Sequence, residues 1–186
     1  MPAGIRIYFE GHNLLKPGFD SFFKDLKNRA REKRCRFELI SSKSGEQGRR
    51  DLAIALKAHR NAWTILLRDS EGPLRRNPAA PHADRVFRMV EMMESWFHAD
   101  QPALADFYGA GFRKSALKAN PNVEKIPKED LEKGLKAATK ECKKGDYFSN
   151  KTSHGPRLLA AISPSLVRQA APNCDRLFHA VLAHLK

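Results

Sequence analysis

The stretch WTILLRDSEG (63–72) joins a continuous apolar run to a turn that carries two carboxylates. The apolar part, 63–67, has the length and composition of a strand that is buried on both faces, as in a parallel sheet. Asp69 and Glu71 follow directly, and Gly72 permits a tight turn after them. The stretch therefore predicts a central strand with acidic side chains at its carboxyl end.

The sequence before this stretch alternates between strand and helix patterns. A β-favouring run at 5–9 ends in Glu10, and a second strand is expected at 36–41. Between them apolar residues recur at helical spacing over 19–34, and another helix is expected over 50–59. The order β-α-β-α-β implies an α/β fold whose parallel sheet has right-handed crossovers.

Helix patterns dominate the rest of the chain. The strongest is expected over 83–99, where Val86, Val90, Met93 and Phe97 would form the buried stripe. Loops are expected at the proline-rich segment and at a later polar segment, and more helices between and after them. The loops are 73–81 and 144–155, and the helices are 101–108, 127–143, 157–162, 165–170 and 174–185.

We expect a single domain over 1–186, because the chain is long enough for one compact core. Its α/β core would occupy 1–100, and a C-terminal helical cap over 101–186 would pack on that core.

Charge and cysteine content indicate a cytoplasmic protein that binds a polyanion. The formal net charge is +13, which favours nucleic acid, although a soluble basic protein with no such role has the same balance. The three cysteines are scattered, as is typical of reduced thiols. No apolar run approaches the roughly 20 residues that span a bilayer, so no membrane association is expected. Glu10 comes too early for a signal peptide.

Acidic residues follow two of the predicted strands. Glu10 ends the first strand, while Asp69 and Glu71 follow the third. Active sites of open parallel sheets lie outside the carboxyl ends of the strands, so these side chains are expected to meet. Such close carboxylates would need a hard divalent cation, Mg²⁺ or Mn²⁺. The alternative is that each acid is a helix cap or a solvated loop charge.

Several other side chains are candidates for the same site. In the helix expected over 83–99, Glu94 lies beside the apolar stripe; its spacing favours a surface group, and a metal ligand or a group facing the site is the alternative. Five basic side chains in loops or near a helix start are candidate phosphate contacts, with solvated surface charges as the alternative. They are His12, Lys125, Lys128, Lys151 and His154.

Longer motifs carry a family resemblance. The pieces IRIYFEG (5–11), DSEGP (69–73), MVEMMESWFHAD (89–100), NPNVEKIPK (120–128) and LLAAISP (158–164) resemble, in order, the bacterial domain-of-unknown-function 4276 family. An acid after the first strand and an acidic pair after the third also resemble the TOPRIM signature. The resemblance implies a TOPRIM-like Rossmannoid sheet flanked by helices. One departure is that the acidic pair is Asp-x-Glu rather than Asp-x-Asp, which puts a two-metal geometry in doubt.

The resemblance also implies an activity. TOPRIM nucleases cut phosphodiester bonds with Mg²⁺, so Glu10, Asp69 and Glu71 are carried over as the catalytic and metal-binding set, with Glu94 as a further ligand. The expected function is a nuclease for DNA or RNA, the effector of an anti-phage defence pair with an ABC- or AAA-type ATPase encoded nearby. The alternative is a non-catalytic basic module that binds an ATPase or nucleic acid.

Overall fold

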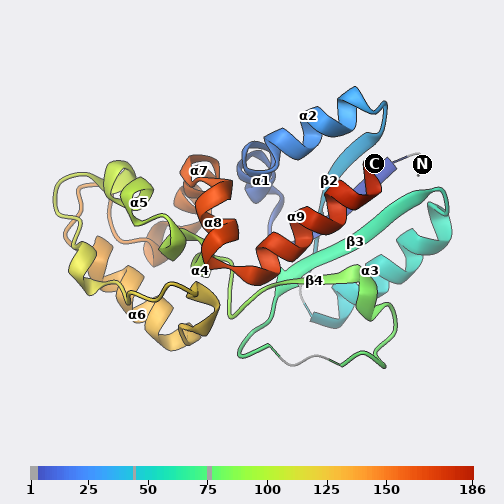
Figure 1. Cartoon of the computed structure of the whole chain (residues 1–186). Helices are drawn as coiled ribbons and strands as arrows, with labels where there is room; N and C mark the ends of the chain where they lie inside the picture. The colour runs from blue at the N-terminus through green and yellow to red at the C-terminus, as the bar shows by residue number, and fades with distance from the viewer. Residues whose placement is uncertain (1–3, 44, 75–76) are drawn as a thin grey trace.

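A computed structural model describes residues 4–43, 45–74 and 77–186, and within them the strands form one four-stranded parallel sheet (Figure 1). The spatial order of the strands is β2-β1-β3-β4. Their bounds are Gly4–Glu10 for β1, Arg36–Ser42 for β2, Ala62–Asp69 for β3 and Val86–Met89 for β4. The predicted α/β class with a parallel sheet flanked by helices is confirmed.

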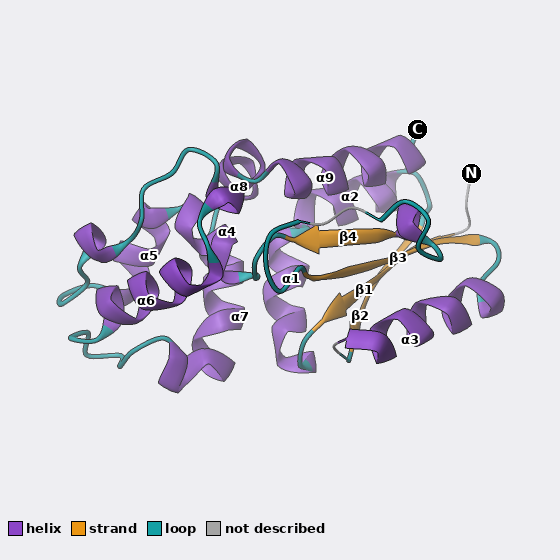
Figure 2. Cartoon of the chain, turned by 90° about the horizontal axis from the view of Figure 1, so that it is seen from below, coloured by secondary structure: helices purple, strands orange, loops and turns teal. Residues whose placement is uncertain are grey.

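Helices cover both faces of this sheet. On one face lie α1 (Lys16–Phe22), α2 (Lys24–Glu32) and the C-terminal α9 (Pro172–His184), and α3 (Gly45–Ala58) lies on the other (Figure 2). Successive side chains of each strand point to opposite faces of the sheet. Ile65 and Leu67 therefore join the large core, while Leu66 packs with Leu52 of α3.

The remaining helices gather beyond the carboxyl ends of the strands, as Figure 2 shows. They are α4 (Glu94–Ala99), α5 (Gln101–Tyr108), α6 (Lys128–Thr139), α7 (Lys151–Ala161) and α8 (Pro164–Ala170). Short 3-10 helices lie at Asn13–Leu15, Ala83–Arg85, Lys114–Ala116, Val123–Lys125 and Phe148–Asn150. This helical half consequently faces the sheet edge where Glu10 and Asp69 end their strands.

The helix expected over 83–99 is wrong in its first half, because Val86–Met89 forms strand β4. Leu66 and Leu67 of β3 pair with Val86 and Phe87, so β4 satisfies the backbone groups at the outer edge of β3. Glu91 then adopts a φ of +62°, which a continuous right-handed helix does not allow. The apolar spacing of 86–97 fits either one continuous helix or a strand followed by a helix, and only pairing with β3 distinguishes the two.

Other boundaries also differ from expectation. The helix expected from residue 50 begins at Gly45, and the one expected over 19–34 breaks at Phe23. The segment 144–155 is not all loop, because α7 begins at Lys151. The loop expected over 73–81 is found at the described positions, while its residues 75 and 76 lie outside the described residues.

The C-terminal helix returns to the sheet. In Figure 1, α9 (red) runs alongside β3 and β4, and its His184 ring stacks on Trp63 of β3 at 4.0 Å between centroids. One hydrophobic cluster runs from Ile5 to Leu185 in sequence. No helix in the described ranges is long and apolar enough to cross a membrane.

Close packing of α1 on α7 joins the sheet to the helical half, and it gives a first prediction. A Cβ on Gly18 would lie 2.5 Å from the Pro156 carbonyl oxygen and 2.7 Å from the Leu159 Cβ. Gly18→Ala should therefore lower the free energy of unfolding by about 1–3 kcal/mol, as overpacked cores do. Urea denaturation measures this, with Ser21→Ala on the exposed side of α1 as the control. Equal unfolding midpoints for both variants would contradict this packing.

Candidate functional site

The candidate site lies at the point of the sheet from which the chain adds strands in opposite directions, β2 on one side of β1 and β3 on the other. The chain leaves β1 through α1 and α2 on one face and leaves β2 through α3 on the other. β1 and β3 are neighbours, so the crevice between their carboxyl ends is the switch point at which open α/β sheets bind ligands. Glu10 is the last residue of β1, and Asp69 is the last residue of β3.

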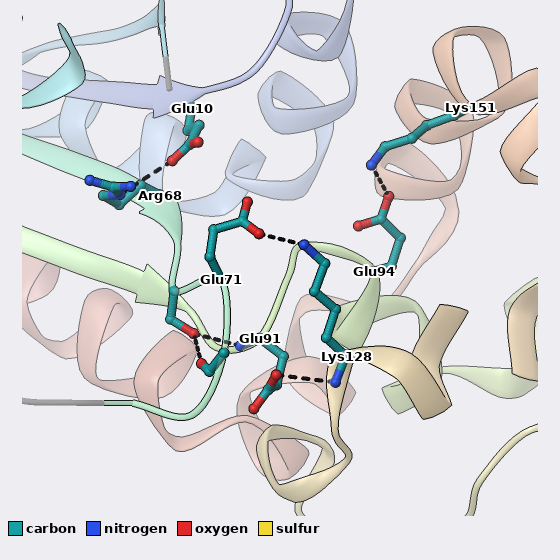
Figure 3. Close-up of polar contacts among 9 residues, drawn as sticks. Glu10, Arg68, Glu71, Glu91, Glu94, Lys128 and Lys151 are labelled. Carbon is teal, nitrogen blue, oxygen red and sulfur yellow. Dashed lines mark hydrogen bonds and ion pairs between the residues drawn. The ribbon is translucent and has the colours of Figure 1, made fainter. Parts of the chain in front are cut away.

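A cavity of about 940 Å³ opens at this point. Glu10, Asp69 and Glu94 all line it, together with Lys151. These four residues come from β1, β3, α4 and α7, so the sheet and the helical half each supply part of the wall. The structure thus places three of the four predicted metal ligands, Glu10, Asp69 and Glu94, on the wall of one cavity. Figure 3 shows Glu10, Glu71 and Glu94, each turned toward a basic side chain.

Asp69 is the most strongly perturbed acid of the site. Burial and then the carboxylates of Glu94, Glu10 and Glu71, in that order, together raise its pKa to about 8, while Lys151 opposes them. Its Oδ1 atom is buried and has no hydrogen-bond partner among the described residues. Asp69 is therefore protonated near neutral pH unless a positive charge enters the cavity.

Glu10 approaches from the other face of the sheet. Strand alternation places it on the side of Tyr8, whereas Asp69 lies on the side of Leu67. Burial raises the pKa of Glu10, although Arg68 opposes this with its Nε 3.3 Å from Oε2. That Oε2 is buried and makes no hydrogen bond to the part of the chain that is described. Glu10 and Asp69 therefore line the same cavity, although their side chains leave opposite faces of the sheet.

Glu94 begins α4 and is fully buried. The hydroxyl of Tyr147 donates to its Oε1 at 2.7 Å, and the Lys151 ammonium lies 2.7 Å from the same oxygen (Figure 3 shows the lysine contact). The other oxygen, Oε2, is buried without a hydrogen bond within the described ranges. Burial, followed by the Glu94 charge, raises the pKa of Tyr147, so its hydroxyl stays a donor.

Glu71 lies at the rim rather than inside. Its backbone has a φ of +55°, which ends the strand alternation, so it does not point into the cavity alongside Asp69 as the two-residue spacing predicted. Its side chain is 51% exposed and forms an ion pair with Lys128. That ion pair raises the pKa of Lys128. Glu71 therefore acts on the buried acids through its charge and not through contact.

The described residues contain no group of three or more Asp, Glu, His or Cys side chains already placed to hold a metal ion. Three of the four acids instead form ion pairs with cations of the chain: Glu10 with Arg68, Glu71 with Lys128 and Glu94 with Lys151. The donor chemistry nevertheless fits a hard cation. Three buried carboxylate oxygens without hydrogen bonds, on Glu10, Asp69 and Glu94, are the ligand type that Mg²⁺ and Mn²⁺ prefer.

The predicted phosphate contacts divide into two groups. Lys151 and His12 line the cavity, and the His12 Nδ1 accepts from the Leu14 backbone N–H. Lys128 reaches the rim through Glu71. In contrast, Lys125 is exposed and does not line the cavity.

His154 is not placed to contact a phosphate. It is buried in α7, and its Nδ1 lies 3.0 Å from the Tyr108 hydroxyl. Burial also lowers its pKa, which favours the neutral ring. The polar sequence around it suggested a loop, whereas the helix turns this side chain inward.

Sequence reasoning missed three residues of the site. Arg68 directly precedes Asp69, and its place at the strand end could have identified it as a partner of Glu10. Tyr147 gave no signal, since only folding brings it to Glu94. Glu91 is buried and accepts from the Lys128 backbone N–H at 3.1 Å, so it holds the start of α6 beside the rim.

The fold and site define an all-parallel α/β protein with an acidic crevice at its switch point. A family model, domain of unknown function DUF4276, matches residues 10–182, and the chain belongs to this family. No curated protein and no solved structure matches the chain.

Proposed function

We propose that the protein is a metal-dependent nuclease that hydrolyses phosphodiester bonds of DNA or RNA. The observation that carries the proposal is the set of three buried carboxylate oxygens without hydrogen bonds at the switch point. The neighbouring carboxylates raise the pKa of Asp69, and ionising it in this place destabilises the fold unless a cation binds. An acidic crevice of this kind is costly for stability, which favours a functional reason for it.

Glu10, Asp69 and Glu94 would hold Mg²⁺ or Mn²⁺ in this proposal, with Glu71 at the rim. The ion supplies Lewis-acid polarisation of a phosphate and a more acidic bound water. Tyr147 keeps Glu94 oriented by donating to one of its oxygens. Lys151 carries a positive charge at the cavity wall, where it attracts the substrate phosphate.

The rest of the chain suits a polyanionic substrate. The net charge of +13 favours a phosphate backbone, and binding should weaken steeply with added salt. We also propose the TOPRIM-like relationship, with α4 to α8 as a cap over the crevice, on the strength of the acids that end β1 and β3. The cytoplasmic location rests on the scattered cysteines of the sequence, and the defence role and the ATPase partner rest on the sequence resemblance alone.

A second candidate is the non-catalytic basic module that binds an ATPase or nucleic acid. One observation favours it: Glu10, Glu71 and Glu94 are already neutralised by Arg68, Lys128 and Lys151. In a protein that only binds, these pairs would be permanent. In a nuclease, the cation would displace them.

A cleavage panel decides between the two functions. Labelled single- and double-stranded DNA and RNA are incubated with the protein in Mg²⁺, Mn²⁺ or EDTA, each with and without the ATPase encoded by a neighbouring gene. We expect products in Mn²⁺ or Mg²⁺ and none in EDTA. Tight nucleic-acid or ATPase binding without products in any metal would establish the second candidate instead.

A further inference from the structure

A second charged cluster lies beside the carboxylates, on the α3 face of the sheet. Arg68 of β3 is the register partner of Arg88 of β4, so the two guanidinium groups leave the same face of neighbouring strands. Arg49 of α3 acts electrostatically on Arg88, as Arg68 does. Three arginines from three elements are therefore concentrated at one end of the sheet.

This cluster borders open space. A cavity of about 600 Å³ is lined by Arg49 and Arg88, and its wall includes Asn77 and Asp84. A smaller cavity of about 300 Å³ shares Arg88 and is lined by Ser70 and Glu71. Arg88 thus lies between the arginine cavity and the rim of the acidic crevice.

The positive charges here exceed the acids available to them. Arg68 lies 3.3 Å from Glu10 and donates to the Gly45 carbonyl oxygen at 3.2 Å. Asp84 pairs with Arg85. Arg88 is partly buried and has no ion pair within the described part of the chain.

The electrostatics agree with this count. Burial lowers the pKa of Arg88, and the charges of Arg68 and Arg49 lower it further, while Glu10 opposes them. Repulsion among guanidinium groups disfavours this arrangement unless an anion binds. A guanidinium is the side chain best suited to phosphate, because its fork of N–H donors matches two phosphate oxygens.

We propose that Arg88 and Arg49, supported by Arg68, bind a second phosphate of the substrate strand, separate from the phosphate that meets the carboxylates. The inference rests on the proposed nuclease function and extends it to the recognition of the substrate. Glu10 then lies between the two centres, since it interacts with both Arg68 and Asp69. The substrate is accordingly a strand with at least two phosphates rather than a mononucleotide.

Binding without cleavage tests the proposal. The whole chain carrying Asp69→Asn is titrated, without metal, with a fluorescent oligonucleotide that has a 5′-phosphate and with the same strand ending in a 5′-hydroxyl. Adding Arg88→Gln or Arg49→Gln should weaken binding about 10-fold and reduce the salt slope by about one. Arg31→Gln, exposed on α2, is the matched control and should change binding less than about 2-fold.

The two strands distinguish the source of the phosphate. If the 5′-phosphate strengthens binding and Arg88→Gln removes that gain, the phosphate is terminal. If both strands lose affinity equally, it is a backbone phosphate. Affinities of Arg88→Gln and Arg49→Gln equal to that of Arg31→Gln would overturn the proposal.

The outcome is separate from that of the cleavage panel, because no step of the titration needs metal or hydrolysis. Unfolding is monitored for each variant. Arg88→Gln should not lower the melting temperature, since it removes a repelled charge. Arg49→Gln, in a different element, is a second, independent test of whether this cavity binds the phosphate.

Discussion

Asp69→Asn is expected to stabilise the metal-free protein at pH 8 while it removes a ligand of the proposed metal site. Burial, together with Glu94, Glu10 and Glu71, raises the pKa of Asp69 from 3.8 to about 8 in the folded chain. Each unit of such a shift corresponds to about 1.4 kcal/mol, so a gain of about 2 kcal/mol or more is expected. For a chain of this size that raises the melting temperature by roughly 4–8 °C.

The pH dependence of this effect has a definite sign. The folded-state pKa of Asp69 lies above its unfolded value of 3.8, so its contribution to stability is fully present below pH 3.8. That contribution is lost as the pH rises through about 8, where the buried carboxyl group ionises. The asparagine does not titrate. The gain in stability should therefore be greatest above pH 8 and should vanish near pH 4.

Thermal denaturation in EDTA from pH 4 to pH 9 measures this, with Asp106→Asn on the exposed side of α5 as the control. Mn²⁺ at about 100 times its dissociation constant should then raise the stability of the wild type by about 2.7 kcal/mol. It should leave Asp69→Asn unchanged. A wild type that is more stable than Asp69→Asn in EDTA at every pH would show that Asp69 is a satisfied structural acid.

Cleavage by the variants is expected to follow the depth of each acid in the crevice. Asp69→Asn, Glu10→Gln and Glu94→Gln each remove a buried carboxylate that faces the cavity, and each should reduce kcat/KM by about 100-fold or more, since an incomplete ligand set weakens the bound ion. Glu71→Gln should reduce it only about 10-fold, because Glu71 is half exposed and paired with Lys128.

Initial rates in Mn²⁺ give this ranking, and Asp106→Asn again serves as the control that changes charge far from the crevice. Each variant must retain the wild-type circular dichroism spectrum, so that lost cleavage is not lost folding. Cleavage that survives both Glu10→Gln and Asp69→Asn would remove the site assigned here. If Glu71→Gln reduced kcat/KM more than Asp69→Asn did, the ion would have to be assigned to the rim rather than to the cavity.

The sequence predicted the central sheet well because its signals are local. The apolar run 63–67, the β-favouring run 5–9 and the helix pattern between the first two strands each carry their period within a few residues. Glu10 and Asp69 could be assigned to one edge because parallel strands share the direction of their carboxyl ends. The strand at Val86–Met89 could not be predicted from local signals, since the β3 residues that pair with it lie 20 positions earlier in the sequence.

The sequence by itself determined that acids follow β1 and β3 and that the chain is strongly basic. Only the tertiary structure decided which acids are buried together, because burial is a property of the assembled helical half. It placed Glu94 and Lys151 in the crevice, left Glu71 at the rim through a positive φ, and turned His154 inward onto Tyr108. It also aligned Arg68 with Arg88. Contacts between residues far apart in the chain have no local pattern, so no periodicity could have revealed them.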